Sequence, residues 1–175
     1  FKPVWKNEEL RTYLGIILAS ALIITVNINY IYGNPVTSFR YAIFQVASII
    51  TTTGFATANY VEWPMLSQTV LMFLMVVGAC ASSTGGGIKV SRLIMAVKGI
   101  KREVMQLLHP KSVNIIRVNG KKVSGDVVRV VFVFLAAYAL IFMLSVIVVS
   151  ADNFDFTTTF SAVLTTIGNV GPGME

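Results

Sequence analysis

The chain has 175 residues, of which 55% are hydrophobic and 13% charged, and its formal net charge is +6. Soluble domains usually carry roughly a quarter charged residues, so this balance argues against a soluble globular protein. The charges are also segregated, leaving apolar stretches of about 20 residues that fit a bilayer. We therefore expect an integral membrane protein. The first residue is Phe1 and no signal-peptide pattern follows it, which indicates the visible part of a longer protein.

The basic residues gather in one connector. Ten of the fourteen Lys and Arg residues lie between Lys89 and Arg129. An excess of Lys and Arg in a short loop marks the cytoplasmic side of a membrane, so residues 98–126 are predicted to be cytoplasmic. This topology explains the positive charge without nucleic acid as a partner. Within the connector, Asn119-Gly120 favours the type I′ turn of a short β-hairpin, with strands predicted over residues 113–118 and 121–123.

Cys80 is the only cysteine and His109 the only histidine. A single cysteine forms no intrachain disulfide, and a single histidine supplies no multi-histidine metal site. We interpret Cys80 as a small packing residue in an apolar run and His109 as a solvated helix end. The two residues also offer no nucleophile–base pair, so we expect neither an enzyme nor an organic cofactor.

Two apolar runs are long enough to cross a membrane. Residues 12–32 carry no charge, and residues 127–150 form the second run. At about 1.5 Å per residue, a helix over either run covers the ~30 Å hydrocarbon layer. Two other apolar stretches, 38–50 and 154–166, are shorter, which indicates re-entrant helices that enter the bilayer and stop. A buried amphipathic helix is the alternative for residues 38–50.

A third apolar segment is interrupted. Residues 65–81 follow Trp63-Pro64, a pair that suits a helix start at a membrane interface. A basic helical pattern resumes over residues 88–108. Glycine costs a helix about 1 kcal/mol relative to alanine, so we expect a break between the two halves, and irregular backbone at this depth must be buried in protein or line water. The residues of this loop are Ser82, Ser83, Thr84, Gly85, Gly86 and Gly87.

The order of full span, short helix and glycine-containing strip occurs twice. Superposing Gly54 on Gly171 also places Phe39 on Phe156, and internal repeats are common in transport proteins. Both strips fit the Thr-Val-Gly-Tyr-Gly pattern of potassium-channel filters, in which backbone carbonyls replace the hydration shell of the ion. Glycine permits backbone angles that are closed to residues with a Cβ. The predicted ion-binding residues are Thr52, Thr53, Gly54, Phe55, Asn169, Val170 and Gly171.

Three segments carry a resemblance to a known family. They are TTTGFATANYVEWP at residues 51–64, GACASSTGGGIKVSRL at 78–93 and NVGPG at 169–173. These segments resemble the Trk/Ktr/HKT potassium-transporter superfamily, and the bacterial TrkH branch most closely. The resemblance covers nearly the whole chain, and the STGGGIK segment is its most specific part.

The resemblance implies an all-α integral membrane fold of four helix–pore-helix–helix repeats around one pore in a single chain. Residues 1–108 would form one complete repeat, the third, with a filter and a broken inner helix. Residues 109–126 would form a cytoplasmic hairpin connector, and residues 127–175 the fourth repeat up to its filter. Because less than two repeats cannot enclose a four-fold pore, we do not expect this chain to conduct ions alone.

The resemblance also implies a function and partners. The function is potassium uptake across the bacterial plasma (inner) membrane through a gated pore, as a channel or a symporter, with potassium as the transported ion. Residues 82–87 would be the gate loop below the filter. The implied partners are the lipid bilayer, two upstream repeats and a final helix of the same protein, a second copy in a homodimer, and cytoplasmic nucleotide-binding regulatory subunits. The basic connector would dock these subunits, or would only be a topology signal.

Three alternatives stay open on the residues alone. One is a sodium or mixed-cation transporter of the same superfamily, although glycine in both strips favours potassium. Another is a membrane-anchored nucleotide-binding protein with residues 83–89 as a phosphate loop. The Walker pattern needs Gly-Lys-Ser/Thr, whereas here Ile88 separates Gly87 from Lys89 and Val90 follows. The third is a passive membrane anchor, which would need no paired re-entrant strips.

Overall fold

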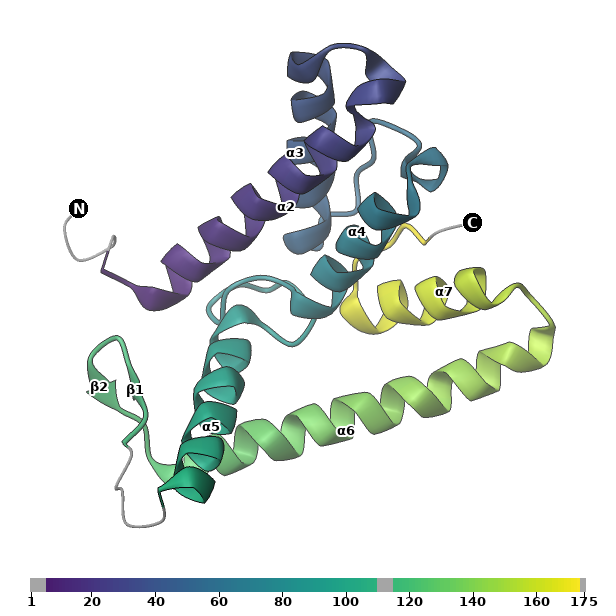
Figure 1. Ribbon diagram of the computed structural model, residues 1–175. Helices are drawn as coiled ribbons and strands as arrows, with labels where there is room; N and C mark the ends of the chain where they lie inside the picture. Colours follow the sequence, from purple (N-terminus) through teal and green to yellow (C-terminus); the bar gives the residue numbers. More distant parts are fainter. Residues whose placement is uncertain (1–5, 110–114, 174–175) are drawn as a thin grey trace.

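The computed structural model describes residues 6–109 and 115–173, which form helices and one short hairpin (Figure 1). The expected all-α fold is thus confirmed. In chain order the elements are α2 (Glu8–Tyr32), α3 (Pro35–Ile50), the 3-10 helix η1 (Tyr60–Glu62), α4 (Met65–Val77), α5 (Val90–Leu108), β1 (Arg117–Val118), β2 (Lys121–Lys122), α6 (Gly125–Val149), the 3-10 helix η2 (Ser150–Asp152) and α7 (Phe156–Gly168).

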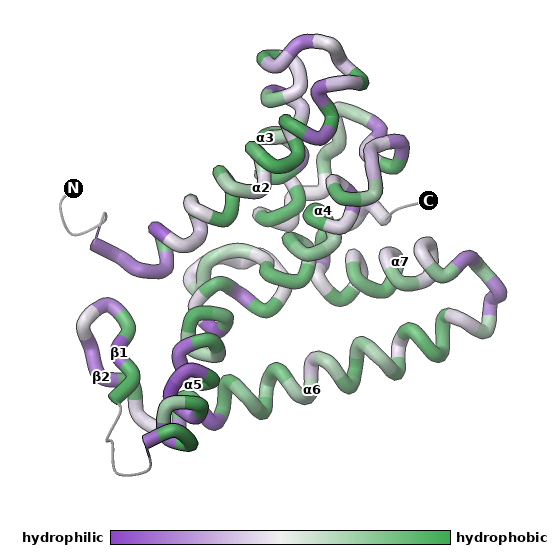
Figure 2. The backbone as a smooth tube through the Cα atoms, viewed as in Figure 1, coloured by the Kyte–Doolittle hydropathy of each residue, from purple (hydrophilic) through white to green (hydrophobic). Residues whose placement is uncertain are grey.

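The two predicted spans are present as α2 and α6, the two described helices with the length and apolar character to cross a membrane. α2 begins four residues before the predicted start, because the Asn7 side chain caps it and accepts a hydrogen bond from the Glu9 N–H at 2.9 Å. It ends at Gly33, which adopts a left-handed conformation with φ of 62°. Of the residues in α6, only Val128 and Val131 are buried, and Figure 2 shows this helix as apolar along most of its length.

The two short helices are also present and run slightly differently from the prediction. α3 begins at Pro35 because Asn34 caps it, accepting from the Val36 N–H at 3.0 Å. α7 begins at Phe156 behind the capping residue Asp155, and it continues to Gly168, so the predicted end at residue 166 is two residues short. The side chains that α2, α3, α4 and α7 bury together form the main core, which includes Ile24, Ile28, Val46, Leu71, Leu74 and Leu164.

The interrupted segment breaks earlier than predicted. α4 ends at Val77, and Gly78 follows with φ of 67° and ψ of −164°, a conformation closed to residues with a Cβ. α5 starts only at Val90, so the loop covers residues 78–89 and contains the predicted loop of residues 82–87. The apolar residues after Val77 therefore belong to a loop and not to the last turn of a helix.

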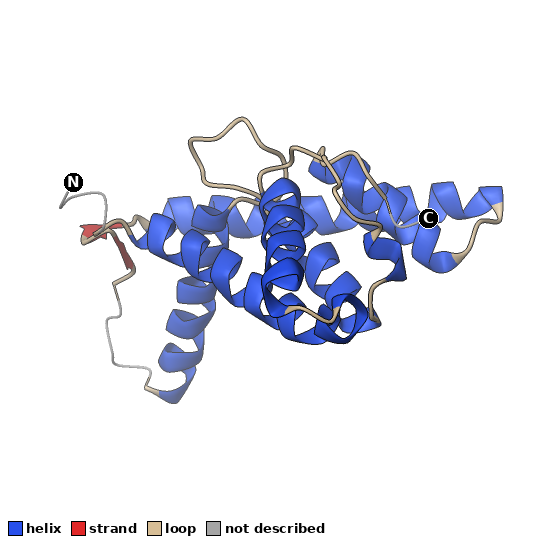
Figure 3. Ribbon diagram, turned by 90° about the horizontal axis from the view of Figure 1, so that it is seen from above, coloured by secondary structure: helices blue, strands red, loops and turns tan. Residues whose placement is uncertain are grey.

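The predicted hairpin is present, and its turn is of the predicted type. Asn119 and Gly120 both have positive φ, 52° and 75°, as a type I′ turn requires. The predicted first strand started at residue 113, which lies partly outside the described residues. The Glu8 N–H donates to Asn119 Oδ1 at 2.7 Å, so the hairpin lies beside the start of α2 (Figures 1 and 3).

Candidate ion filter and gate loop

The first strip, residues 52–54, comes after α3, and its N–H groups donate hydrogen bonds back to carbonyls of that helix. The N–H of Thr52 donates to the Ile49 carbonyl at 3.0 Å, and the N–H of Thr53 donates to the Ser48 carbonyl at 2.9 Å. Thr52 and Gly54 have positive φ, 56° and 79°. Left-handed residues on both sides of Thr53 permit successive carbonyls to face one side of the chain, whereas in an extended strand they alternate.

The second strip, residues 169–171, repeats this geometry at the end of α7. Asn169 and Gly171 have positive φ, 53° and 108°, at the positions that the superposition of Gly54 on Gly171 makes equivalent to Thr52 and Gly54. The Val170 N–H donates back to the Thr165 carbonyl at 2.9 Å. The repeat seen in the sequence is thus matched residue by residue in the backbone.

The carbonyl groups of both strips have no hydrogen-bond donor within the described part of the chain. None of the six carbonyls accepts a hydrogen bond there, although most of the N–H groups of the same residues donate to carbonyls of the preceding helix. Val170 is buried and Thr52 and Gly54 are half-buried, whereas Thr53, Asn169 and Gly171 are exposed, so these carbonyl oxygens are free to bind water or a cation. The C-terminal ends of α3 and α7, which carry partial negative charge, also run into the strips. The six residues are Thr52, Thr53, Gly54, Asn169, Val170 and Gly171.

The two strips touch each other. A Cβ built on Gly54 would lie 2.3 Å from the carbonyl oxygen of Val170 and 3.1 Å from Cδ of Pro172. The Val170 side chain meanwhile packs into the main core, where it is 3% exposed. Val170 therefore anchors its strip through the side chain and leaves its carbonyl beside the first strip.

Phe55 differs from the other predicted ion-binding residues. Its carbonyl accepts a hydrogen bond from Ser48 Oγ at 2.6 Å, and its ring is exposed.

Tyr60 stabilises the segment that follows the second strip. Its Oη donates a hydrogen bond to the Gly173 carbonyl at 2.8 Å. Burial raises the pKa of the Tyr60 phenol, so this hydroxyl keeps its proton and remains a donor.

The loop of residues 78–89 contains the predicted gate loop of residues 82–87 and is called the gate loop from here on; it is closed at its base. The N–H of Ile88 donates to the Val76 carbonyl at 3.0 Å, and the N–H of Lys89 donates to the Val77 carbonyl at 2.9 Å. The loop thus leaves α4 and returns to it, and its ends cannot drift apart while these two bonds hold.

The tip of the gate loop contacts both strips. A Cβ built on Gly86 would lie 2.0 Å from the carbonyl oxygen of Gly168, the residue before Asn169. One built on Gly85 would lie 3.0 Å from Thr52 Oγ1. The glycines that the sequence singled out are therefore needed for close approach of the loop to the strips.

Two charged side chains hold the gate loop, and the sequence did not single them out for this role. Lys89 Nζ donates to the Ser83 carbonyl at 2.8 Å and to the Ala81 carbonyl at 3.3 Å. Glu9, at the start of α2, accepts from the Ala81 N–H at 2.6 Å. The position of Lys89 two residues after Gly87 was a usable signal, whereas nothing in the sequence marks Glu9 as a neighbour of the gate loop.

Comparison with known proteins identifies the family of the chain. The profile of the family described as TrkH, cation transport protein, matches residues 16–174. The chain belongs to the TrkH family. The chain is 37% identical over 175 residues to the Trk system potassium uptake protein TrkH of Vibrio parahaemolyticus and 34% identical over 175 residues to that of Salmonella typhimurium. Each match covers 99% of this chain and 36% of the relative.

A solved TrkH structure has the same fold. The crystal structure of the potassium transporter TrkH from Vibrio parahaemolyticus superposes with a TM-score of 0.90 at 36% identity, covering 98% of this chain and 37% of that one. The predicted family and the predicted membrane-transporter fold are thus confirmed. This TrkH-family chain spans a little over a third of the length of the relatives it matches.

Proposed function

We propose that the full-length protein takes up potassium through a pore whose filter includes the two strips. The proposal rests on two backbone-equivalent strips that touch at Gly54 and Val170, whose six carbonyls accept no hydrogen bond from the described residues. Carbonyl oxygens in such a row can replace the hydration shell of a monovalent cation. The names of the TrkH-family relatives, which are potassium uptake proteins, support potassium as the ion.

The domain boundaries form part of this proposal. Residues 1–108 contribute one repeat of outer helix, pore helix, filter and broken inner helix, and residues 127–175 contribute an outer helix, a pore helix and a filter. Residues 109–126 connect them on the cytoplasmic side. In this arrangement α3 and α7 are the pore helices, and the gate loop lies below the filter. Upstream repeats and a final helix complete the pore, and a homodimer with cytoplasmic regulatory subunits completes the assembly.

The alternative of a nucleotide-binding protein loses its structural basis. A phosphate loop connects a strand to a helix, and its lysine follows glycine directly. Here α4 precedes the gate loop, and Lys89 uses its ammonium group to hold two carbonyls of that loop. Nothing in this arrangement leaves the lysine available for a phosphate.

Growth on limiting potassium tests the proposed function. The full-length protein is produced in bacterial cells that lack their own potassium uptake systems. We expect it to restore growth at low external potassium and to accumulate the potassium analogue rubidium faster than sodium. Restored sodium accumulation with no gain in rubidium would contradict the proposal and favour the sodium alternative. A protein that reaches the membrane and moves neither ion would contradict both.

Labelling of introduced cysteines tests the orientation in the bacterial inner membrane. In a full-length variant without native cysteines, a cysteine at Lys121 is expected to resist an impermeant thiol reagent in intact cells and to react after the cells are opened. A cysteine at Asn153, in the connection between α6 and α7, is expected to react in intact cells. Both side chains are exposed, so access to solvent within the protein is comparable. The reverse pattern would invert the proposed topology.

A further inference from the structure

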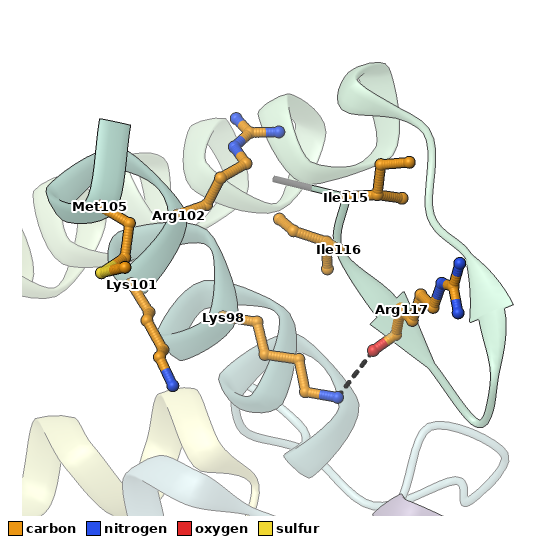
Figure 4. Close-up of a pocket in the computed structure, with 7 residues that line it drawn as sticks. All are labelled: Lys98, Lys101, Arg102, Met105, Ile115, Ile116 and Arg117. Carbon is orange, nitrogen blue, oxygen red and sulfur yellow. Dashed lines mark hydrogen bonds between the residues drawn. The ribbon is translucent and has the colours of Figure 1, made fainter. Parts of the chain in front are cut away.

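A basic pocket lies between α5 and the hairpin, apart from the strips and the gate loop. Its volume is about 250 Å³. Figure 4 shows Lys101 and Arg102 leaving α5 in different directions, while Ile115, Ile116 and Arg117 belong to the facing segment. Four cationic and three apolar side chains line it: Lys98, Lys101, Arg102, Arg117, Met105, Ile115 and Ile116.

The pocket has more positive charge than its neighbours neutralise. Lys98 Nζ pairs with Glu8 Oε2 at 2.5 Å, and Arg102 pairs with Glu103 at 2.6 Å. Among the described residues, Lys101 and Arg117 have no ion pair. Unpaired positive charge on the walls of one cavity attracts an anion, so the pocket favours an anionic ligand.

The position of the pocket is that of a membrane surface. Lys98 forms an ion pair with Glu8, which is the first residue of the spanning helix α2. One residue further along, Gly99 lies against Phe132 of α6, because a Cβ at Gly99 would be 2.8 Å from that ring. The pocket is therefore level with the first turns of both spanning helices, where phospholipid headgroups end.

The outer face of α5 adds a surface for acyl chains. An exposed apolar stripe recurs along the helix at Val97, Ile100, Val104 and Leu107, of which Leu107 is 83% exposed. A helix with apolar residues on one face and Lys and Arg on another suits the headgroup–acyl boundary. Met105, Ile115 and Ile116 continue this apolar character into the pocket itself. A soluble anion would make no use of these side chains.

We propose that this pocket binds the phosphate headgroup of an anionic phospholipid from the cytoplasmic leaflet. The phosphate lies in the pocket, with the charge of Lys101 on one side of it and that of Arg117 on the other (Figure 4), and the first methylenes of the lipid run along Met105 and the exposed stripe of α5. Basic pockets beside membrane-spanning helices on the cytoplasmic side are suited to such headgroups. Since α5 directly follows the gate loop, a bound lipid fixes the position of the segment that carries Lys89.

Native mass spectrometry of the purified full-length protein in a neutral detergent tests this site. The probe is phosphatidylglycerol, with phosphatidylcholine as the zwitterionic reference. The double variant Lys101→Gln/Arg117→Gln is expected to lower phosphatidylglycerol occupancy roughly tenfold, because each cation near an anionic lipid contributes appreciably to binding. The matched control Lys121→Gln/Lys122→Gln removes the same charge from exposed residues outside the pocket and is expected to leave occupancy unchanged.

A further variant and a soluble competitor distinguish the possible outcomes. The charge-preserving variant Lys101→Arg/Arg117→Lys is expected to retain binding, which separates loss of charge from misfolding. Equal losses in the two glutamine variants, or no loss in either, would overturn the pocket. Glycerol phosphate that competes as well as the lipid would show a site for soluble anions and overturn the lipid assignment. A pocket variant that keeps its lipid and loses a cytoplasmic protein subunit would also overturn it. None of these readouts depends on potassium transport.

Discussion

Replacing Gly54 with serine in the full-length protein is expected to lower the preference for potassium over sodium roughly tenfold, because filter selectivity depends on the placement of carbonyl oxygens. Gly54 has a φ of 79°, and a left-handed conformation costs a residue with a Cβ about 1–2 kcal/mol. The new Cβ would also lie 2.3 Å from the Val170 carbonyl oxygen. The first strip must shift or the Val170 carbonyl must turn, and either change disturbs the ion-binding oxygens. Uptake of rubidium and sodium, measured in parallel, gives the ratio.

Gly33→Ala is the matched control for this substitution. Gly33 also has a left-handed φ, 62°, but a Cβ there meets nothing within 4 Å, and the residue ends α2 far from the strips. This variant carries the same conformational cost without the contact with Val170, so we expect its ion preference to be unchanged. An unaltered rubidium-to-sodium ratio in Gly54→Ser would contradict the assignment of this strip to the filter.

Replacing Lys89 with methionine is expected to raise potassium flux in the absence of regulatory subunits. Lys89 makes two hydrogen bonds to gate-loop carbonyls, at 2.8 Å and 3.3 Å. Bonds to a charged group contribute about 1.5–3 kcal/mol when formed, and partial exposure reduces this, so we expect an increase of roughly tenfold. Methionine keeps the length of the side chain, and Lys89→Arg, which keeps the charge and the donors, is expected to stay near the original flux.

Deleting Gly85–Gly87 tests the same gate from the tip of the loop. The deletion removes the residues that lie against Gly168 and Thr52, while the hydrogen-bonded base at Val76 and Val77 has to re-form around a shorter loop. If the loop blocks the pore, flux rises and becomes less dependent on regulatory subunits. If the loop is only a packing element, the deletion lowers thermal stability. A folded Lys89→Met protein and a folded deletion with unchanged, fully regulated flux would contradict the gate.

Sequence periodicity and composition predicted the helices well because membrane burial leaves a strong local pattern. Both spans, both short helices and the type I′ turn at Asn119-Gly120 are present in the structure. The errors are at boundaries. The extension of α3 to Pro35 follows from the cap at Asn34, a local signal that the apolar pattern alone does not contain. The end of α4 at Gly78 depends on a backbone conformation, which composition does not encode.

The candidate site was predicted in part for a similar reason. Glycine positions and the internal repeat identified the two strips, because a left-handed φ restricts which residues fit. The contact between Gly54 and Val170 depends on how α3 and α7, which are distant in the sequence, pack together. The hydrogen bonds that Lys89 and Glu9 make to the gate loop depend on where α2 starts relative to that loop. Contacts between segments far apart in the chain leave no periodic signal, so one sequence could not supply them.

Anomalous scattering from rubidium in crystals of the full-length protein is the most direct measurement of the central claim that these strips bind cations through their backbone. We predict an ion coordinated by the carbonyl oxygens of Thr53 and Val170, which occupy equivalent positions in the two strips, together with those of the remaining repeats. In the Gly54→Ser protein this peak is expected to weaken. Rubidium bound elsewhere, with the carbonyls of both strips hydrogen-bonded to protein donors, would contradict the account.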